Sequence, residues 1–102
     1  MSTKSRRAAG RAARCWELRV YVANEGTRST LTIANLERLC EQSVPGRYWI
    51  QVVNLLKRPE LASADQIVAV PTIVRRSPLP ERRVIGTLSD SEAAMTALEL
   101  NS

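Results

Sequence analysis

The side chains with the greatest chemical capacity are two cysteines, Cys15 and Cys40, and several arginine pairs. The cysteines lie 25 positions apart and form neither a C-x-x-C motif nor a zinc-ligand spacing. Histidine is absent, which excludes Ser-His-Asp and Cys-His devices and removes the commonest metal ligand. Cys40 falls on an apolar helical stripe and is expected in the core. The residue types therefore predict neither an enzyme nor a metal or cofactor site.

Positive charge is concentrated in one segment. The 102 residues carry 15 Lys or Arg and 10 Asp or Glu, a net charge of +5. Residues 1–14 contain five of the bases and no acid, and the remainder is neutral overall. A nucleic-acid-binding domain carries its basic residues on the folded face. Charge therefore gives no support to such a face here.

The Ser/Ala/Arg-rich segment over residues 1–15 has three interpretations. It matches a basic arm that contacts phosphates or anionic lipid, and its composition also matches a transit peptide. We favour a solvated, disordered extension followed by one domain over residues 16–102. No apolar run approaches the roughly 20 residues of a membrane span. Without a secretory signal, we expect a cytoplasmic protein and no membrane partner.

The first half of that domain predicts a βαβ unit. Strict alternation over 16–22 predicts a strand with one buried face. Apolar residues then recur at helical spacing, with candidate hydroxyl caps at Thr27, Ser29 and Thr30, and the helix ends at Val44-Pro45-Gly46. The β-branched and aromatic run over 48–55 suits a central strand that is covered on both faces. The two strands are expected to be parallel, with a right-handed crossover.

The second half predicts a short helix, two strands and a closing helix. Pro59 suits the first position of a helix over 60–66, and 67–74 reads as a strand with Pro71 at its start or edge. A turn at 77–80 leads to a strand over 82–85. Ser89 and Glu92 fit a capping box for a helix to about residue 100. The order β-α-β-α-β-β-α predicts an α/β protein with a thioredoxin-like, mixed four-stranded sheet flanked by helices.

Residues 18 to about 100 resemble the KaiB family of bacterial circadian-clock proteins. Four blocks carry the resemblance, at residues 20–23, 53–62, 69–72 and 82–89 (VYVA, VNLLKRPELA, AVPT and RRVIGTLS). The resemblance implies a non-enzymatic, cofactor-free adaptor with a thioredoxin-like fold. It implies binding to the ATPase hexamer KaiC in a phosphorylation-dependent way, capture of KaiA, and displacement of a sensor kinase that carries a KaiB-like domain.

The resemblance also implies fold switching. In the family, a resting tetramer with a different C-terminal half interconverts slowly with a thioredoxin-like monomer that binds KaiC. A homo-oligomer, dimer or tetramer, therefore stays open for this chain. Pro71 aligns with the cis-proline of thioredoxin-like folds. Two other function classes stay open: a thiol oxidoreductase on the same scaffold, and nucleic-acid binding through the N-terminal arm.

The residues expected to contact a KaiC-type partner are Trp49, Lys57, Arg58, Arg82 and Arg83. For Trp49, an interface anchor and ordinary core packing are equally compatible with the sequence. The Arg75-Arg76 pair is expected on a solvated face. Gln51 and Gln66 stand where the family tends to place lysines, and Leu31 replaces an arginine. These lost charges leave open whether the partner is a divergent KaiC or another protein.

Four residues are expected to influence which fold is populated: Pro71, Gly86, Ala97 and Glu99. The family reads roughly Ile-Gly-Leu-Asp where this chain has Thr-Ala-Leu-Glu over 96–99. Glycine inside a helix costs roughly 0.8–1 kcal/mol relative to alanine, and glutamate forms helices better than aspartate. The thioredoxin-like fold is therefore expected as the resting state, unless the alternative fold is also helical at Ala97.

Overall fold

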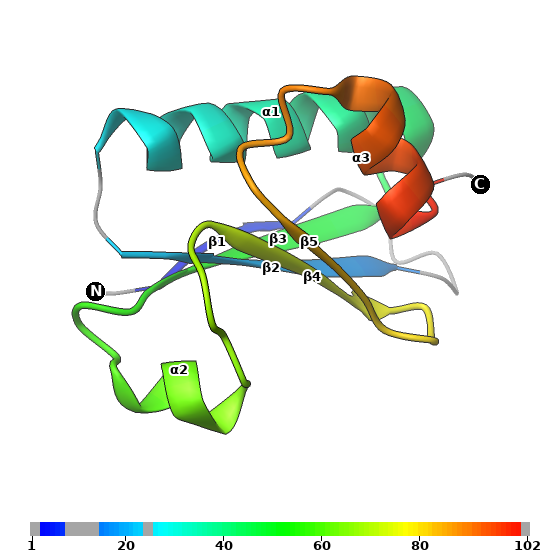
Figure 1. Cartoon of the computed structure of the whole chain (residues 1–102). Coiled ribbons are helices and arrows are strands. Elements are labelled where there is room, and N and C mark those ends of the chain that lie inside the picture. The colour runs from blue at the N-terminus through cyan, green and yellow to red at the C-terminus, as the bar shows by residue number, and fades with distance from the viewer. Residues whose placement is uncertain (1–2, 8–14, 24–25, 101–102) are drawn as a thin grey trace.

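The computed structural model places residues 3–7, 15–23 and 26–100. A mixed sheet in the order β1-β3-β2-β4-β5 runs through the centre of the molecule (Figure 1). Three helices pack around it. In chain order the elements are β1 (Thr3–Arg7), β2 (Trp16–Val22), α1 (Thr27–Ser43), β3 (Tyr48–Asn54), α2 (Glu60–Ala64), β4 (Thr72–Ser77), β5 (Arg82–Ile85) and α3 (Ser91–Leu98).

Strand β2 lies at the centre of the predicted four-stranded unit. It pairs in parallel with β3, from Trp16 opposite Tyr48 to Val22 opposite Asn54. On its other side it pairs antiparallel with β4, which pairs antiparallel with β5. This arrangement confirms the thioredoxin-like fold class. The expectation that β3 is covered on both faces is wrong, because half-buried residues remain along it. It does lie inside the sheet, between β1 and β2.

Strand β1 adds a fifth member to the sheet. It pairs antiparallel with β3, from Thr3 opposite Val53 to Arg7 opposite Trp49. The expectation of a disordered extension over residues 1–15 is wrong for this segment. Main-chain hydrogen bonds to an open sheet edge require no apolar alternation, so the sequence pattern carries no signal for such a strand. The rest of the arm, residues 1–2 and 8–14, lies outside the described residues.

The two faces of the sheet are covered unequally. Helices α1 and α3 lie together on one face, and the short α2 lies on the other (Figure 1). The main apolar core lies between the sheet and the helix pair, where Leu36, Leu39 and Ile50 are fully buried. The α2 side holds a smaller cluster of Tyr21, Val53 and Val74.

Several element ends differ from the sequence-based predictions. The hydroxyl-capped start predicted for α1 is wrong, because its N-cap is Gly26 without a side-chain cap. Strand β4 begins at Thr72 rather than at residue 67, since Pro71 directly precedes it and proline has no N–H to donate. The Val70–Pro71 peptide bond is cis. Helix α2 is shorter than predicted and follows Pro59 as its N-cap.

The closing helix α3 is capped by Asp90 instead of Ser89. The Asp90 carboxylate accepts a hydrogen bond from the Ala93 N–H at 3.1 Å. A carboxylate also interacts favourably with the positive end of the helix dipole, which a hydroxyl does only weakly. Ser89 instead shares a 2.7 Å hydroxyl hydrogen bond with Thr87. The helix ends at Leu98, and Glu99 is its C-cap, with a left-handed φ of 53°.

Candidate functional site

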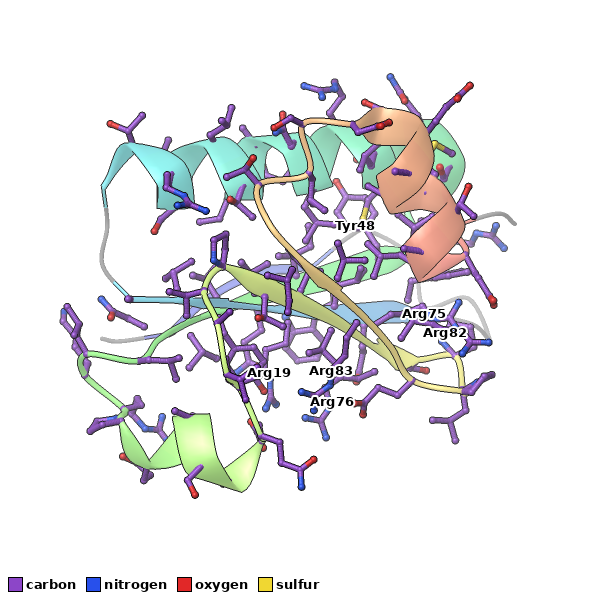
Figure 2. All side chains as sticks on the ribbon, viewed as in Figure 1. Arg19, Tyr48, Arg75, Arg76, Arg82 and Arg83 are labelled. Atoms are coloured by element: carbon purple, nitrogen blue, oxygen red, sulfur yellow. The ribbon has the colours of Figure 1, made fainter. Side chains whose placement is uncertain are left out.

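The five predicted partner-contact residues occupy three segments and do not form one cluster. Trp49 lies in β3, Lys57 and Arg58 lie in the turn after it, and Arg82 and Arg83 lie in β5. Neighbouring residues of a strand point to opposite faces of a sheet. Arg82 therefore reaches the α3 side and Arg83 the α2 side (Figure 2). The arginine pair thus serves two different surfaces.

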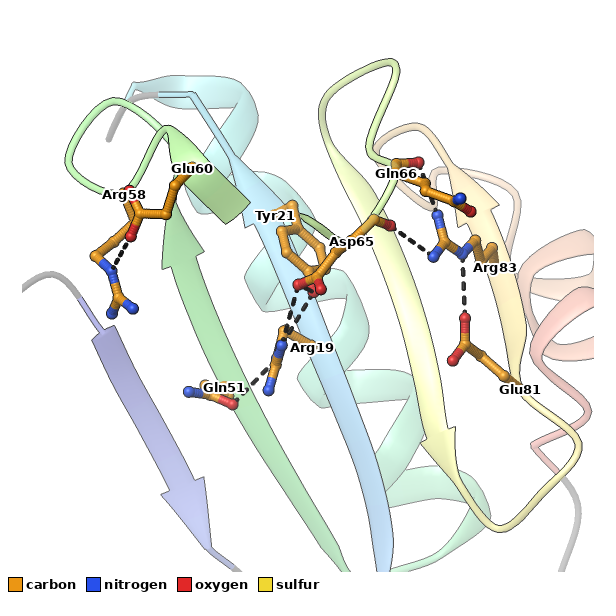
Figure 3. A network of polar contacts seen from close by, with 9 residues as sticks. All are labelled: Arg19, Tyr21, Gln51, Arg58, Glu60, Asp65, Gln66, Glu81 and Arg83. Atoms are coloured by element: carbon orange, nitrogen blue, oxygen red, sulfur yellow. Dashed lines mark hydrogen bonds and ion pairs between the residues drawn. The ribbon is translucent and has the colours of Figure 1, made fainter. Parts of the chain in front are cut away.

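Arg83 ties β5 to the segment after α2. Its guanidinium donates to the carbonyl oxygens of Asp65 at 2.7 Å and Gln66 at 3.0 Å. Its Nε also pairs with the Glu81 carboxylate at 3.2 Å (Figure 3). Gln66, which stands where the family tends to place a lysine, adopts a left-handed φ of 58° in this segment. Arg83 therefore has a structural role while 37% of its side chain stays exposed.

Lys57 and Arg58 are exposed at the carboxyl end of β3. Asn54 shapes this turn, because its side-chain oxygen accepts from the Leu56 N–H at 2.9 Å and its carbonyl accepts from both cationic residues' N–H groups. Arg58 pairs with Glu60 at 3.0 Å. The Glu60 backbone N–H and then Arg58 hold the pKa of the Glu60 carboxyl below its ordinary value. Within the described residues, the Lys57 ammonium has no ion-pair partner.

Trp49 is half-buried on the sheet face that α2 leaves open. It lines a pocket of about 240 Å³ together with Glu17, Arg19, Gln51 and Arg76. Gln51 does not replace the charge of a family lysine; its side-chain oxygen accepts from Arg19 at 3.2 Å. Trp49 is therefore neither a core residue nor a fully exposed anchor.

A polar network missed by the sequence analysis joins α2 to the sheet. The Tyr21 hydroxyl donates to the Asp65 carboxylate, which also pairs with Arg19 at 3.3 Å (Figure 3). Burial, and then the hydrogen bond to Asp65, raises the pKa of Tyr21 above its ordinary value of 10.0. Alternation places Arg19 and Tyr21 on one face, but nothing in the sequence signals Asp65, 44 positions later.

Arg75 is a second residue that the sequence analysis misplaced. The expectation of a solvated Arg75-Arg76 pair is wrong for Arg75, whose side chain is 3% exposed. Its guanidinium lies 5.2 Å from the Trp16 ring centre and donates to the Leu98 carbonyl at 3.0 Å and the Pro80 carbonyl at 2.6 Å. Arg75 therefore satisfies the carboxyl end of α3 and the β4–β5 loop together. Arg76, on the opposite face, is exposed.

The four predicted fold-state residues lie in the C-terminal half. The Pro71 carbonyl accepts from the Gly86 N–H at 2.9 Å, and Gly86 has a φ of 123°, which favours glycine. Ala97 is exposed inside α3. The placement of Glu99 inside the helix is wrong, because Glu99 is the left-handed C-cap. At this position the Glu99 carboxylate pairs with Arg82 at 3.1 Å. Because Glu99 lies outside the helix interior, its helix propensity does not stabilise α3.

The buried cysteine is poorly placed for thiol chemistry. Cys40 is fully buried, and burial followed by the nearby Glu41 and Glu37 raises its pKa from 9.0 to about 12. Cys15 is exposed, and neither cysteine forms a disulfide. The described residues contain no group of three or more acidic or cysteine side chains that could hold a metal ion. Among the described helices, none combines the length and the apolar character that a membrane span requires.

Comparison with known proteins gives one consistent result. The KaiB domain model matches residues 19–100. The circadian clock oscillator protein KaiB of Synechococcus elongatus is 40% identical over 83 residues, which cover 81% of each chain. The Nostoc punctiforme protein of the same name is 37% identical over 90 residues, which cover 88% of this chain and 86% of that one.

Two solved structures share the fold. The N-terminal domain of Synechococcus elongatus SasA superposes with a TM-score of 0.70 at 19% identity, covering 87% of this chain and 86% of that domain. Chloroplastic thioredoxin z superposes with a TM-score of 0.65 at 20% identity, covering 87% of this chain and 80% of that one. Both support the thioredoxin-like arrangement.

Proposed function

The chain belongs to the KaiB family, and on that premise we propose that it is a clock or signalling adaptor that binds a KaiC-type ATPase hexamer. The observation that carries this proposal is the family match over residues 19–100 together with the arrangement of the C-terminal half. Strands β4 and β5 pair antiparallel after Pro71. The resemblance to the family implies that this thioredoxin-like state is the one that binds KaiC.

The proposed contact surface is the α2 side of the molecule. It combines the exposed cations Lys57 and Arg58 with Arg83 and the half-buried Trp49. Cations at the rim of such a surface steer an acidic partner and set the salt dependence of association. Arg82 lies on the α3 side, paired with Glu99, and is expected to contribute less.

A sensor kinase or a KaiA-like regulator is a further proposed partner. The N-terminal domain of SasA has the same fold as this chain. Two proteins with one fold can compete for one binding site, and on this ground we propose that the adaptor displaces a kinase. The adaptor is proposed to act without catalysis, since the Cys40 thiol is buried and has a pKa of about 12.

The test measures binding of the full chain to the KaiC-type ATPase of its own source organism. We expect tighter binding when the hexamer carries ATP or phosphate. Lys57→Ala is expected to weaken binding about tenfold and to flatten its salt dependence. Arg38→Ala is the matched control, because it removes an exposed cation from α1 on the other side of the sheet.

Two outcomes would count against the adaptor. One is absence of ATPase binding combined with recovery of only nucleic acid from a host lysate. The other is a disulfide reductase activity that disappears in Cys40→Ser, which would support the oxidoreductase alternative. If Lys57→Ala and Arg38→Ala weakened ATPase binding equally, the interface would not lie on the α2 side.

A further inference from the structure

Strand β1 lies outside the part of the chain that matches the KaiB domain. Its five residues are Thr-Lys-Ser-Arg-Arg, with three cations and no apolar side chain. A strand of this composition is held to its neighbour mainly by main-chain hydrogen bonds. It is therefore displaced more easily than a strand that also packs apolar side chains into a core.

The edge that β1 covers has the opposite character. Strand β3 reads Tyr-Trp-Ile-Gln-Val-Val-Asn, with no charged residue and no proline. Proteins usually protect exposed edge strands with lysine, proline or bulges, because an open row of N–H and C=O groups pairs with other chains. Strand β3 has none of these protections in its own sequence, and β1 supplies the cover.

The sequence of β3 is also complementary to itself. When two copies align antiparallel with Gln51 opposite Gln51, Trp49 lies opposite Val53 and Ile50 lies opposite Val52. Aromatic–aliphatic and aliphatic–aliphatic cross-strand pairs are favourable, and no like charges meet anywhere in this register. The result is a two-fold, self-complementary interface of the kind that most homodimers use.

We propose that β1 is a displaceable strap over the β3 edge, and that with β1 lifted this edge pairs with β3 of a second copy about a two-fold axis at Gln51. The strap keeps the chain monomeric by occupying the edge in cis. This device is independent of ATPase binding, because it needs only the β1–β3 pairing and the sequence of β3.

The test uses the full chain with Lys4→Pro and Ser5→Pro together. Successive residues of an edge strand direct their N–H groups alternately toward and away from the neighbouring strand, so one of these two prolines removes a β1–β3 hydrogen bond. Lys4→Ala with Ser5→Ala is the matched control, since it removes the same side chains and charge but keeps both N–H groups. Analytical ultracentrifugation over a concentration series gives the oligomeric state.

We expect a monomer for the parent chain and the alanine control, and a concentration-dependent dimer for the proline variant. Adding Gln51→Glu keeps an oxygen for Arg19 and places two carboxylates opposite each other, which is expected to weaken the dimer about tenfold. A monomeric proline variant would overturn the proposal. So would a dimer insensitive to Gln51→Glu, or a parent chain that already forms the Gln51-sensitive dimer.

Discussion

The two sides of the sheet differ in what they bury. On the α1–α3 side, apolar side chains from both helices and four strands form one large cluster. On the α2 side, three buried residues form the apolar cluster, and hydrogen bonds among Arg19, Tyr21 and Asp65 complete the contact. The first side therefore supplies most of the folding free energy, and the second leaves cations, a tryptophan and a pocket accessible.

This difference gives the two sides separate roles. A tightly packed interior tolerates little change, because each buried methylene contributes to stability. A surface with few apolar contacts can change its residues with little cost to the fold. The partner site is therefore expected on the α2 side, and the following substitutions test that division from the largest expected effect to the smallest.

Truncating the core on the α1–α3 side should cost the most. Leu36 is fully buried in α1, and Leu36→Ala is expected to lower the free energy of unfolding by about 2–5 kcal/mol. Leu61 is half-buried in α2 and packs against the smaller apolar cluster, so Leu61→Ala is expected to cost about 1 kcal/mol. Urea denaturation of both variants measures the contrast. Equal losses would show that the two sides contribute alike.

Substituting Arg75 should show that a polar side chain can also be essential for stability on the α1–α3 side. Arg75→Ala leaves the carbonyl oxygens of Leu98 and Pro80 without this donor, and we expect a loss of about 3 kcal/mol. Arg76→Ala, one position away on the α2 side, should stay within about 0.5 kcal/mol of the parent. Thermal and urea unfolding of the pair give the comparison. An Arg76 loss as large as that of Arg75 would contradict it.

Tyr21→Phe tests the polar contact on the α2 side. Removing the hydroxyl that donates to Asp65 is expected to cost about 1–2 kcal/mol at neutral pH. Because the folded-state pKa is raised, folding holds the Tyr21 proton when the unfolded chain has lost it. This contribution is complete below the ordinary pKa of 10.0 and is lost as the pH rises through the folded-state value.

Stability curves at neutral and alkaline pH measure that effect. The phenylalanine variant should lose less stability than the parent between about pH 10 and the folded-state pKa. An identical alkaline loss in the two proteins would show that Tyr21 is not the group responsible.

Ala97→Gly should give the smallest effect. Ala97 is exposed within α3, so glycine is expected to destabilise this helix by about 1 kcal/mol and to shift the ratio of fold states about fivefold. NMR exchange spectroscopy should then reveal a larger minor population. Glu99→Asp should change that population little, because Glu99 is the C-cap. A larger effect from Glu99→Asp than from Ala97→Gly would reverse the assignment.

Local sequence signals predicted the elements of the thioredoxin-like unit. The alternation of 16–22 and the helical spacing of Leu36, Leu39 and Cys40 report directly on one buried face each. Strand β1 was not predicted, because main-chain pairing with the edge of β3 needs no side-chain pattern. The cover of β3 was misjudged because an apolar run does not reveal how completely the helices cover each face of the strand, and half-buried residues remain along it.

The site was harder to predict than the fold. The exposed positions of Lys57 and Arg58 follow from the turn that contains them. The division of Arg82 and Arg83 between two faces follows from strand alternation, but their partners Glu99 and Asp65 lie far away in sequence. Arg75 looked like its exposed neighbour because composition does not distinguish a solvated arginine from a buried one that meets helix carbonyls.

Hydrogen exchange of the full chain with and without its KaiC-type ATPase in the ATP state tests the central claim most directly. The α2-side adaptor predicts slowed amide exchange over residues 57–66 and β5 on binding, and unchanged exchange over α1. Slowed exchange confined to α1 and α3, or no change anywhere at saturating ATPase, would contradict the account.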